Sequence, residues 1–291
     1  MPVSKHILIN WALFIALSLI WGSSFILMKE GLRALTAYQV AALRIASGGL
    51  VLLPVALRHL QVIPSNKLVY VILSGVLGSF IPAFLYCIAE TKIDSSLAAF
   101  LNALTPISTI IIGVLFFKSK LPLQKVLGVV IGLAGMAILL FGDGSVNLDN
   151  VSFSSLVLIA TVCYSLNANI VNRYLKDVGS IKIAAVSFGI LFLPCLIILL
   201  MSGFFQLSFS QANTIRATGA GMLLGVAGTA VASIIFFQLL KRAGIVFSSL
   251  VTYGIPFVAL MWGLIAGENI TYIQIGGLIL ILFAVYTANR G

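Results

Sequence analysis

Ten long apolar segments make up most of this chain of 291 residues. A helix needs about 20 mainly apolar residues to cross the hydrocarbon core of a bilayer. Of all residues, 61% are hydrophobic and only 8% are charged, which is typical of a polytopic membrane protein. The sequence therefore predicts an all-α membrane protein with ten transmembrane helices. The segments cover residues 7–28, 37–57, 68–90, 95–117, 122–141, 152–173, 181–201, 216–240, 244–266 and 271–289.

The distribution of charge predicts how the chain lies in the bilayer. In a soluble protein the net charge of +10 would suggest a nucleic-acid partner, but here the charges sit in short loops. With the N-terminus inside, twelve Lys and Arg residues fall in inner loops and termini, against four at outer positions. This bias follows the positive-inside rule. We therefore expect both termini in the cytoplasm, a lipid bilayer as the surrounding partner and no nucleic acid.

The chain also contains an internal repeat. Residues 75–113 recur as residues 225–263, and residues of the first two segments recur at a shift of 143. The repeat predicts two halves of five helices, residues 1–146 and residues 147–291. Because five is odd, the second half must enter from the opposite side, so the halves are expected to be inverted. The matched pairs include Gly78 with Gly228, Ser79 with Thr229, Tyr86 with Phe236, Pro106 with Pro256, Trp21 with Tyr164, and Ser24 with Asn167.

Polar and aromatic residues at helical spacing indicate where a substrate would bind. Such a stripe on an apolar membrane helix faces protein or a cavity, because unsatisfied polar groups in lipid are costly. Packing between helices is the alternative role for each hydroxyl. Pro106 and Pro256 are predicted to break their helices, which opens a site or only shapes the bundle. The predicted substrate-binding residues are Trp21, Ser24, Tyr86, Asn102, Tyr164, Asn167 and Tyr253.

Three charged residues are predicted to act in gating or coupling. Arg44 lies inside the second segment, where it either snorkels to the interface or acts on the substrate or an outer gate. Glu90 and Glu268, near outer helix ends, are its possible partners. Since no other Asp or Glu comes close to a plausible path, a proton relay through a carboxylate buried deep in a span is not expected.

The sequence predicts neither catalysis nor a metal or cofactor. Its three cysteines are isolated within the segments, and neither an HExxH motif nor a Ser-His arrangement is present. An intramembrane enzyme and a channel are thus the weaker alternatives to a carrier. Small residues on the fifth and tenth segments, Gly128, Gly132 and Gly135 and then Gly276 and Gly277, indicate close helix packing, in a monomer or a homodimer.

The motifs taken in order resemble the drug/metabolite transporter superfamily, specifically its EamA-type ten-helix members. The resemblance runs the full length and rests on Trp21-Gly22-Ser23-Ser24-Phe25, Ala42-Leu43-Arg44, the two prolines and Gly267-Glu268. In the first repeat Phe117-Lys118 replaces the Gly-Glu pair, so a symmetric pair of carboxylates is not expected. The resemblance implies export or exchange of small metabolites, amino acids among them.

Taken together, these features predict a secondary transporter in the cell (inner) membrane. The expected cargo is an amino acid or a similar small polar or aromatic solute, exported by alternating access. Multidrug, purine and vitamin-type carriers of the same fold are the alternatives.

Overall fold

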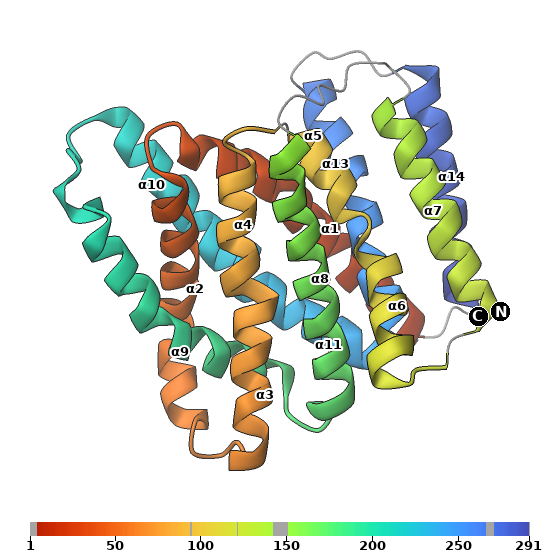
Figure 1. The fold of residues 1–291 in the computed structure, drawn as a ribbon, viewed down its shortest axis with the longest axis horizontal. Helices are drawn as coiled ribbons and strands as arrows, with labels where there is room; N and C mark the ends of the chain where they lie inside the picture. Colours follow the sequence, from red (N-terminus) through yellow and green to blue (C-terminus); the bar gives the residue numbers. More distant parts are fainter. Residues whose placement is uncertain (1–4, 94, 121, 142–150, 266–270, 291) are drawn as a thin grey trace.

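The computed structural model describes residues 5–93, 95–120, 122–141, 151–265 and 271–290, and every regular element in these ranges is helical (Figure 1). The α-helices are α1 Lys5–Leu32, α2 Ala37–His59, α3 Ser65–Gly75, α4 Ile81–Ala89, α5 Ser95–Asn102, α6 Thr105–Phe117, α7 Leu123–Phe141, α8 Val151–Tyr174, α9 Ser180–Met201, α10 Ala212–Gly225, α11 Ala232–Ala243, α12 Ile245–Ser249, α13 Val251–Ile265 and α14 Tyr272–Arg290. Two π-helical turns, η1 Val76–Phe80 and η3 Val226–Val231, and one 3-10 turn, η2 Phe204–Gln206, complete the set.

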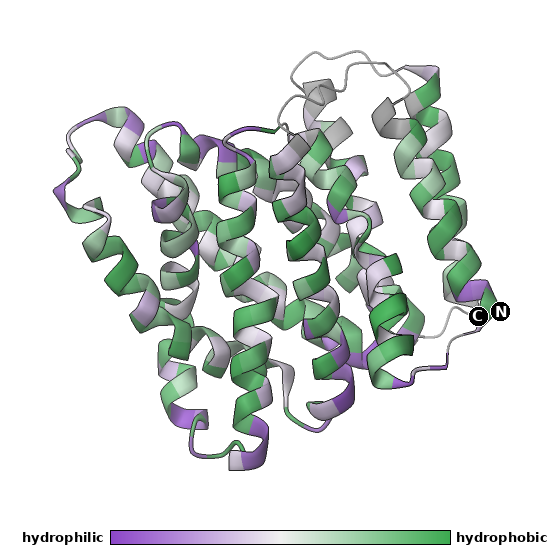
Figure 2. Cartoon of the chain, viewed as in Figure 1, coloured by the Kyte–Doolittle hydropathy of each residue, from purple (hydrophilic) through white to green (hydrophobic). Residues whose placement is uncertain are grey.

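Seven helical stretches in the described ranges are long and apolar enough to cross a membrane. Three shorter apolar helices occupy the other predicted segments, over Leu123–Ile138, Ile245–Val258 and Ile275–Ala288. Apolar residues cover the middle of the bundle, and polar residues gather at its two ends (Figure 2). The all-α fold is therefore confirmed, whereas the ten spans and the inverted repeat stay predictions.

The third and eighth spans carry a π-helical turn at matching places. The turns η1 and η3 begin at Val76 and Val226, which are related by the shift of 150 seen in the sequence. A π-turn adds a residue to one helical turn and is often found at functional sites. Each turn contains a glycine, Gly78 or Gly228, so the backbone there can be approached closely.

The fourth and ninth segments are interrupted, but not both at their prolines. Pro106 stands in the first turn of α6. Because proline has no backbone N–H, the carbonyl of Asn102, four residues earlier, lacks its helical donor, and α5 ends at Asn102. Pro256 instead lies within α13, and the interruption falls earlier, at Leu250 between α12 and α13. The prediction that Pro256 itself breaks its helix is therefore wrong.

The helices pack in reciprocal pairs. The second helix of the first half, α2, lies along its counterpart α9, and α7 lies along its counterpart α14 (Figure 1). Likewise α1 packs on α13 while α8 packs on α6, and α10 packs on α2 while α3 packs on α9. These contacts between the halves thus have equivalents in which the roles of the halves are exchanged.

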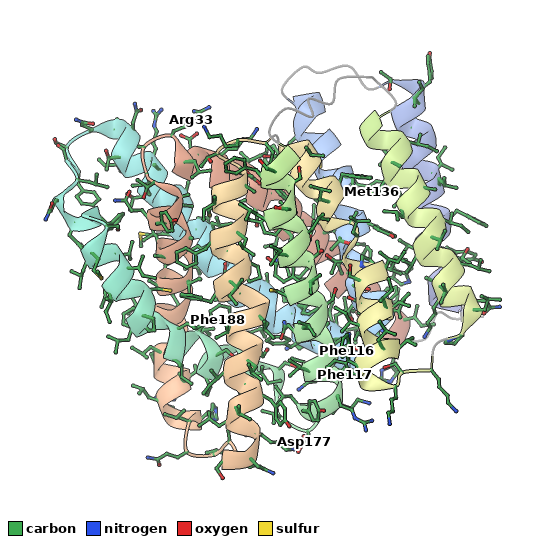
Figure 3. All side chains as sticks on the ribbon, in the orientation of Figure 1. Arg33, Phe116, Phe117, Met136, Asp177 and Phe188 are labelled. Carbon is green, nitrogen blue, oxygen red and sulfur yellow. The ribbon has the colours of Figure 1, made fainter. Side chains whose placement is uncertain are left out.

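Polar contacts tie the loops at the two ends of the bundle. Lys67 pairs with Asp177, and the ammonium of Lys241 donates to the carbonyl oxygen of Val178. At the other end, Glu30 and Arg33 form an ion pair with an N–O distance of 2.9 Å. Figure 3 shows Arg33 and Asp177 at opposite ends of the molecule. The loops that follow α1 and α8 therefore lie on opposite sides.

Candidate functional site

A cavity is lined by residues of both halves. The first, third, fourth, sixth, eighth and ninth apolar segments all contribute to it, together with α2. Its empty volume, which includes the part open to solvent, is about 1020 Å³. Arg44 lines the cavity. Six of the seven predicted binding residues also line it, namely Trp21, Ser24, Tyr86, Asn102, Tyr164 and Asn167.

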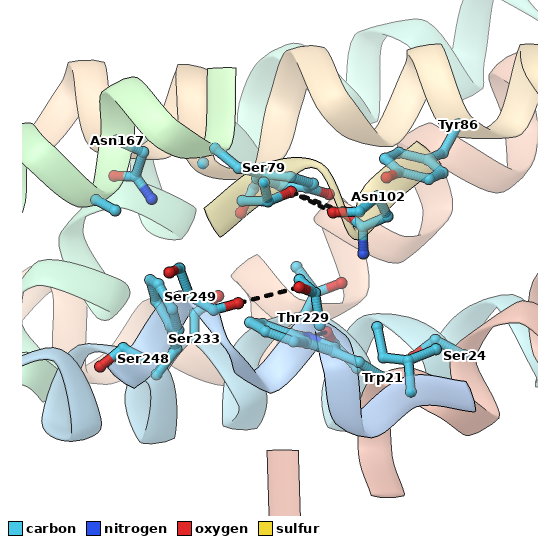
Figure 4. A pocket seen from close by; sticks show the side chains of 18 of the residues that line it. Trp21, Ser24, Ser79, Tyr86, Asn102, Asn167, Thr229, Ser233, Ser248 and Ser249 are labelled. Carbon is cyan, nitrogen blue, oxygen red and sulfur yellow. Dashed lines mark hydrogen bonds between the residues drawn. The ribbon is translucent and has the colours of Figure 1, made fainter. Parts of the chain in front are cut away.

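The cavity has two facing walls (Figure 4). Asn167, Ser79, Asn102 and Tyr86 lie on one wall, whereas Trp21, Ser24, Thr229, Ser233, Ser248 and Ser249 lie on the other. The walls correspond through the repeat, because lining residues recur in pairs at shifts of 143 and 150. These pairs are Trp21 with Tyr164, Ser24 with Asn167, Gly78 with Gly228, Ser79 with Thr229, Tyr86 with Phe236, and Asn102 with Thr252.

The glycines of the π-turns let polar side chains approach the backbone in equivalent ways. A Cβ atom at Gly228 would lie 2.7 Å from the Ser24 hydroxyl, and one at Gly78 would overlap the Asn167 amide. The Trp21 indole donates to the carbonyl oxygen of Gly228 at 3.2 Å. The pairs Gly78–Asn167 and Gly228–Ser24 are equivalent through the repeat. The same contact, a polar side chain against a glycine of a π-turn, therefore occurs in both walls.

The two asparagines present free donors to the cavity. The Asn167 Oδ1 atom accepts a hydrogen bond from Ser74 at 2.7 Å, and the Asn102 Oδ1 atom accepts one from Thr105 at 3.2 Å. Within the described residues, neither amide nitrogen has a protein partner. Figure 4 shows both nitrogens turned toward the gap between the walls. Each is therefore available to a carbonyl or carboxylate oxygen of a ligand.

Arg44 is the one charged side chain among the residues that line the cavity. Its Nε atom donates to Thr229 Oγ1 at 3.2 Å, which holds the guanidinium against η3. The expected pairing with Glu90 is wrong for this conformation, since the ion pairs found in the described ranges do not include it. Glu268, the other expected partner, lies outside the described residues.

Glu90 follows the third span, which ends at Ala89, yet it is buried, with 7% of its surface exposed. Its Oε2 atom accepts from Ser95 at 3.2 Å, whereas Oε1 has no partner within the described chain. Burial raises the pKa of this carboxyl to about 8, against the lowering effects of Ser95, Lys29 and Arg44. The sequence placed Glu90 near the outer end of the third segment but did not indicate its burial or its contact with Ser95.

Tyr253, the seventh predicted binding residue, does not line the cavity. Its side chain is fully buried on the other face of α13, and its hydroxyl donates to the Val129 carbonyl oxygen of α7 at 2.7 Å. Its ring packs where a Cβ atom at Gly132 would stand. Thr252 occupies the cavity instead, because consecutive residues of an α-helix point about 100° apart. The prediction for Tyr253 is therefore corrected to a packing role.

Replacement of Tyr253 by phenylalanine is expected to lower thermal stability and to leave substrate affinity unchanged. The variant leaves the Val129 carbonyl without its donor, at a typical cost of about 1 kcal/mol. The midpoint of thermal unfolding in detergent measures the effect. Tyr272→Phe is the control, because Tyr272 is 92% exposed. Equal midpoints for the two variants would contradict the packing role.

Three serines of the cavity were missed by the sequence analysis. Ser233, Ser248 and Ser249 all line the second wall. Their counterparts in the first half are alanines, at positions 83, 98 and 99, so the repeat did not single them out. Only the residue type, a hydroxyl in an apolar span, could have indicated them.

Comparison with known proteins identifies the family. The sequence model of the EamA-like transporter family matches residues 9–141 and again residues 152–290, so the chain belongs to this family. It is therefore a multi-pass membrane protein and a transporter.

Individual relatives agree with this assignment. The "Uncharacterized inner membrane transporter YedA" of Escherichia coli strain K12 is 26% identical, over 96% of this chain and 90% of that protein. The "Uncharacterized transporter YdfC" of Bacillus subtilis is 27% identical, over 75% of this chain and 70% of that protein. One solved structure, titled "Crystal structure of protein", has a TM-score of 0.72 and 19% identity, covers 98% of this chain and 96% of its own, and shows the shared fold.

Proposed function

We propose that this protein is a secondary transporter that moves a small metabolite by alternating access between two inverted halves, residues 1–146 and 147–291, each with five spans. The cavity carries the proposal, because paired residues of the two halves line it from facing walls. Carriers with inverted repeats bind substrate where the repeats meet and expose it to each side in turn. The reciprocal packing of the helices and the opposite positions of the loops after α1 and α8 support the inversion.

The chemistry of the cavity favours a small solute with an apolar body and hydrogen-bond acceptors. Trp21, Tyr164 and Phe236 supply aromatic surface, the two asparagines supply free donors, and Arg44 supplies one positive charge. An amino acid or an aromatic carboxylate has acceptors for these donors. A purine or a neutral drug fits the aromatic surface but leaves the charge of Arg44 unmatched, at a cost in binding.

We further infer that the carrier works in the cell inner membrane with both termini in the cytoplasm. The positive-inside bias of the loops supports this orientation, and the printed name of the Escherichia coli relative supports the membrane. The family resemblance supports export as the physiological direction.

The proposed function predicts counterflow in proteoliposomes. Vesicles loaded with an unlabelled solute should transiently accumulate the same labelled solute, because a carrier exchanges cargo across its alternating states. The panel comprises L-amino acids and benzoate, with purine bases and a cationic drug as the alternative cargoes. Accumulation measured by filtration should occur for at least one amino acid or benzoate and should saturate.

Protein-free vesicles of the same lipid serve as the control. Linear, unsaturable flux without stimulation by internal solute would indicate a channel. Counterflow of a purine or the drug alone would keep the carrier and replace the proposed cargo.

A further inference from the structure

Glu90 and Tyr86 together carry two buried polar atoms without partners. Glu90 follows Tyr86 by one helical turn, and its backbone N–H donates to the Tyr86 carbonyl oxygen at 2.9 Å. The Tyr86 hydroxyl and Glu90 Oε1 are buried, and neither has a hydrogen-bond partner in the described chain. A buried polar atom left unpaired costs about 1–3 kcal/mol. Two such atoms on consecutive turns therefore need an explanation.

Some groups around Glu90 favour its charged form, whereas its burial favours the neutral form. Lys29 of α1 and Arg44 of α2 favour the carboxylate, and so does the hydrogen bond from Ser95 of α5. Burial opposes them and is the larger effect, so the pKa stands at about 8. On the same helix, Tyr86 and Cys87 add no positive charge, and Tyr164 of α8 faces Tyr86 at a ring distance of 6.1 Å. Glu90 therefore keeps its proton well above the pH at which an ordinary glutamate loses it.

Tyr86, one helical turn before Glu90, lies in the wall of the cavity. Tyr86 lines the cavity from α4, and its side chain lies beside Asn102 on one wall (Figure 4). Arg44 lines the same cavity and acts electrostatically on Glu90. Arg44 therefore acts both on Glu90, where Lys29 has the larger effect, and on any negatively charged group in the cavity.

We propose that Glu90 binds the proton of a proton-coupled cycle and that a protonated Glu90 leaves Arg44 free to hold the anionic group of the solute. This inference rests on the proposed carrier function. The carboxylate takes a proton from the water on one side, forming its O–H bond, and the same bond breaks when the proton leaves on the other side. A charged Glu90 competes with the solute for Arg44, so proton and anionic solute bind together and cross in the same direction. Such a carrier exports a solute only while the outward gradient of the solute exceeds the inward gradient of protons.

The first test measures the proton without any solute. Infrared titration of the purified protein from about pH 6 to about pH 10 follows the C=O band of protonated carboxyls, since ordinary Asp and Glu are ionised throughout this range. The wild type should lose such a band with a midpoint of about 8. Glu90→Gln should remove the titration. Arg44→Gln should move its midpoint to higher pH, because Arg44 lowers the pKa of Glu90.

Glu30→Gln is the matched control, because Glu30 is another carboxylate at a helix end, and it pairs with Arg33 away from the cavity. It should keep the wild-type titration. The absence of a titrating band in the wild type, or its persistence in Glu90→Gln, would overturn the proposal.

The second test measures coupling with L-amino acids and benzoate as probes. Acidifying the outside by one pH unit, from a starting pH above the pKa of about 8, should speed wild-type uptake by up to about tenfold, because the protonated fraction of Glu90 follows the proton concentration there. Glu90→Gln should lose this acceleration, and the control Glu30→Gln should keep both counterflow and its acceleration. Acceleration that survives in Glu90→Gln would overturn the proposal.

Two further outcomes are separable. If Glu90→Gln shows no counterflow, Glu90→Asp, which restores a titratable group, should recover both counterflow and acceleration, and failure to do so would overturn the proposal. If the wild type shows no counterflow with any probe, the proposed function fails, and the infrared titration alone decides whether Glu90 binds the proton.

Discussion

Replacing Gly225 with alanine is expected to abolish most of the folded protein. A Cβ atom at this position would overlap the carbonyl oxygen of Arg44 and the hydroxyl of Ser47 on α2. The serine can rotate away, but the carbonyl belongs to the helix backbone, so α10 and α2 would have to separate. Overpacking typically costs about 1–3 kcal/mol, and displacing two helices costs more than shifting a side chain. The monodisperse fraction on size-exclusion chromatography and the midpoint of thermal unfolding measure the loss.

Gly219 supplies the matched control on the same helix. A Cβ atom there meets nothing within 4 Å, so Gly219→Ala adds the same methyl group without a clash. Alanine is the better helix former by about 0.8–1.0 kcal/mol, so this variant should be as stable as the wild type or slightly more so. Equal behaviour of the two variants would show that α2 and α10 do not approach as closely as described.

Two properties of a membrane chain made much of the site predictable. Long apolar segments can only be helices in lipid, so their positions could be read from hydropathy alone. A polar residue within such a helix must face protein, which selected Asn102 and Asn167. The repeat then matched Trp21 with Tyr164 across the two halves, and both line the cavity.

The errors come from features that depend on local geometry or tertiary contacts. Tyr253 and Thr252 are neighbours in sequence, and a polarity rule cannot tell which of them faces the cavity when the helix is interrupted at Leu250. The burial of Glu90 depends on the contact with Ser95 of the next helix. The π-turns change the phase of the third and eighth spans, and only the positions of their glycines hinted at them.

Arg44→Ser is expected to reduce counterflow strongly while leaving the protein folded. Serine is the residue at the symmetric position, Ser187, where its hydroxyl donates to the Val71 carbonyl oxygen at 2.7 Å, so the fold accepts this residue type there. The variant removes the only charge on the described cavity wall, together with the donor to Thr229. A hydrogen bond to a charged group contributes about 1.5–3 kcal/mol, which corresponds to a loss of roughly tenfold to a hundredfold in apparent affinity.

Arg33→Ser is the control for the loss of a positive charge. The Arg33 side chain is 75% exposed at the end of the first span and pairs only with Glu30, so its removal should leave counterflow unchanged. The unfolding midpoint of each variant, compared with that of the wild type, separates a binding defect from a folding defect. The expected pattern for Arg44→Ser is a near wild-type midpoint with a raised half-saturation concentration for anionic solutes. Normal counterflow in that variant would mean that the guanidinium only points toward the membrane interface and that the cavity holds its solute by the aromatic residues and amides alone.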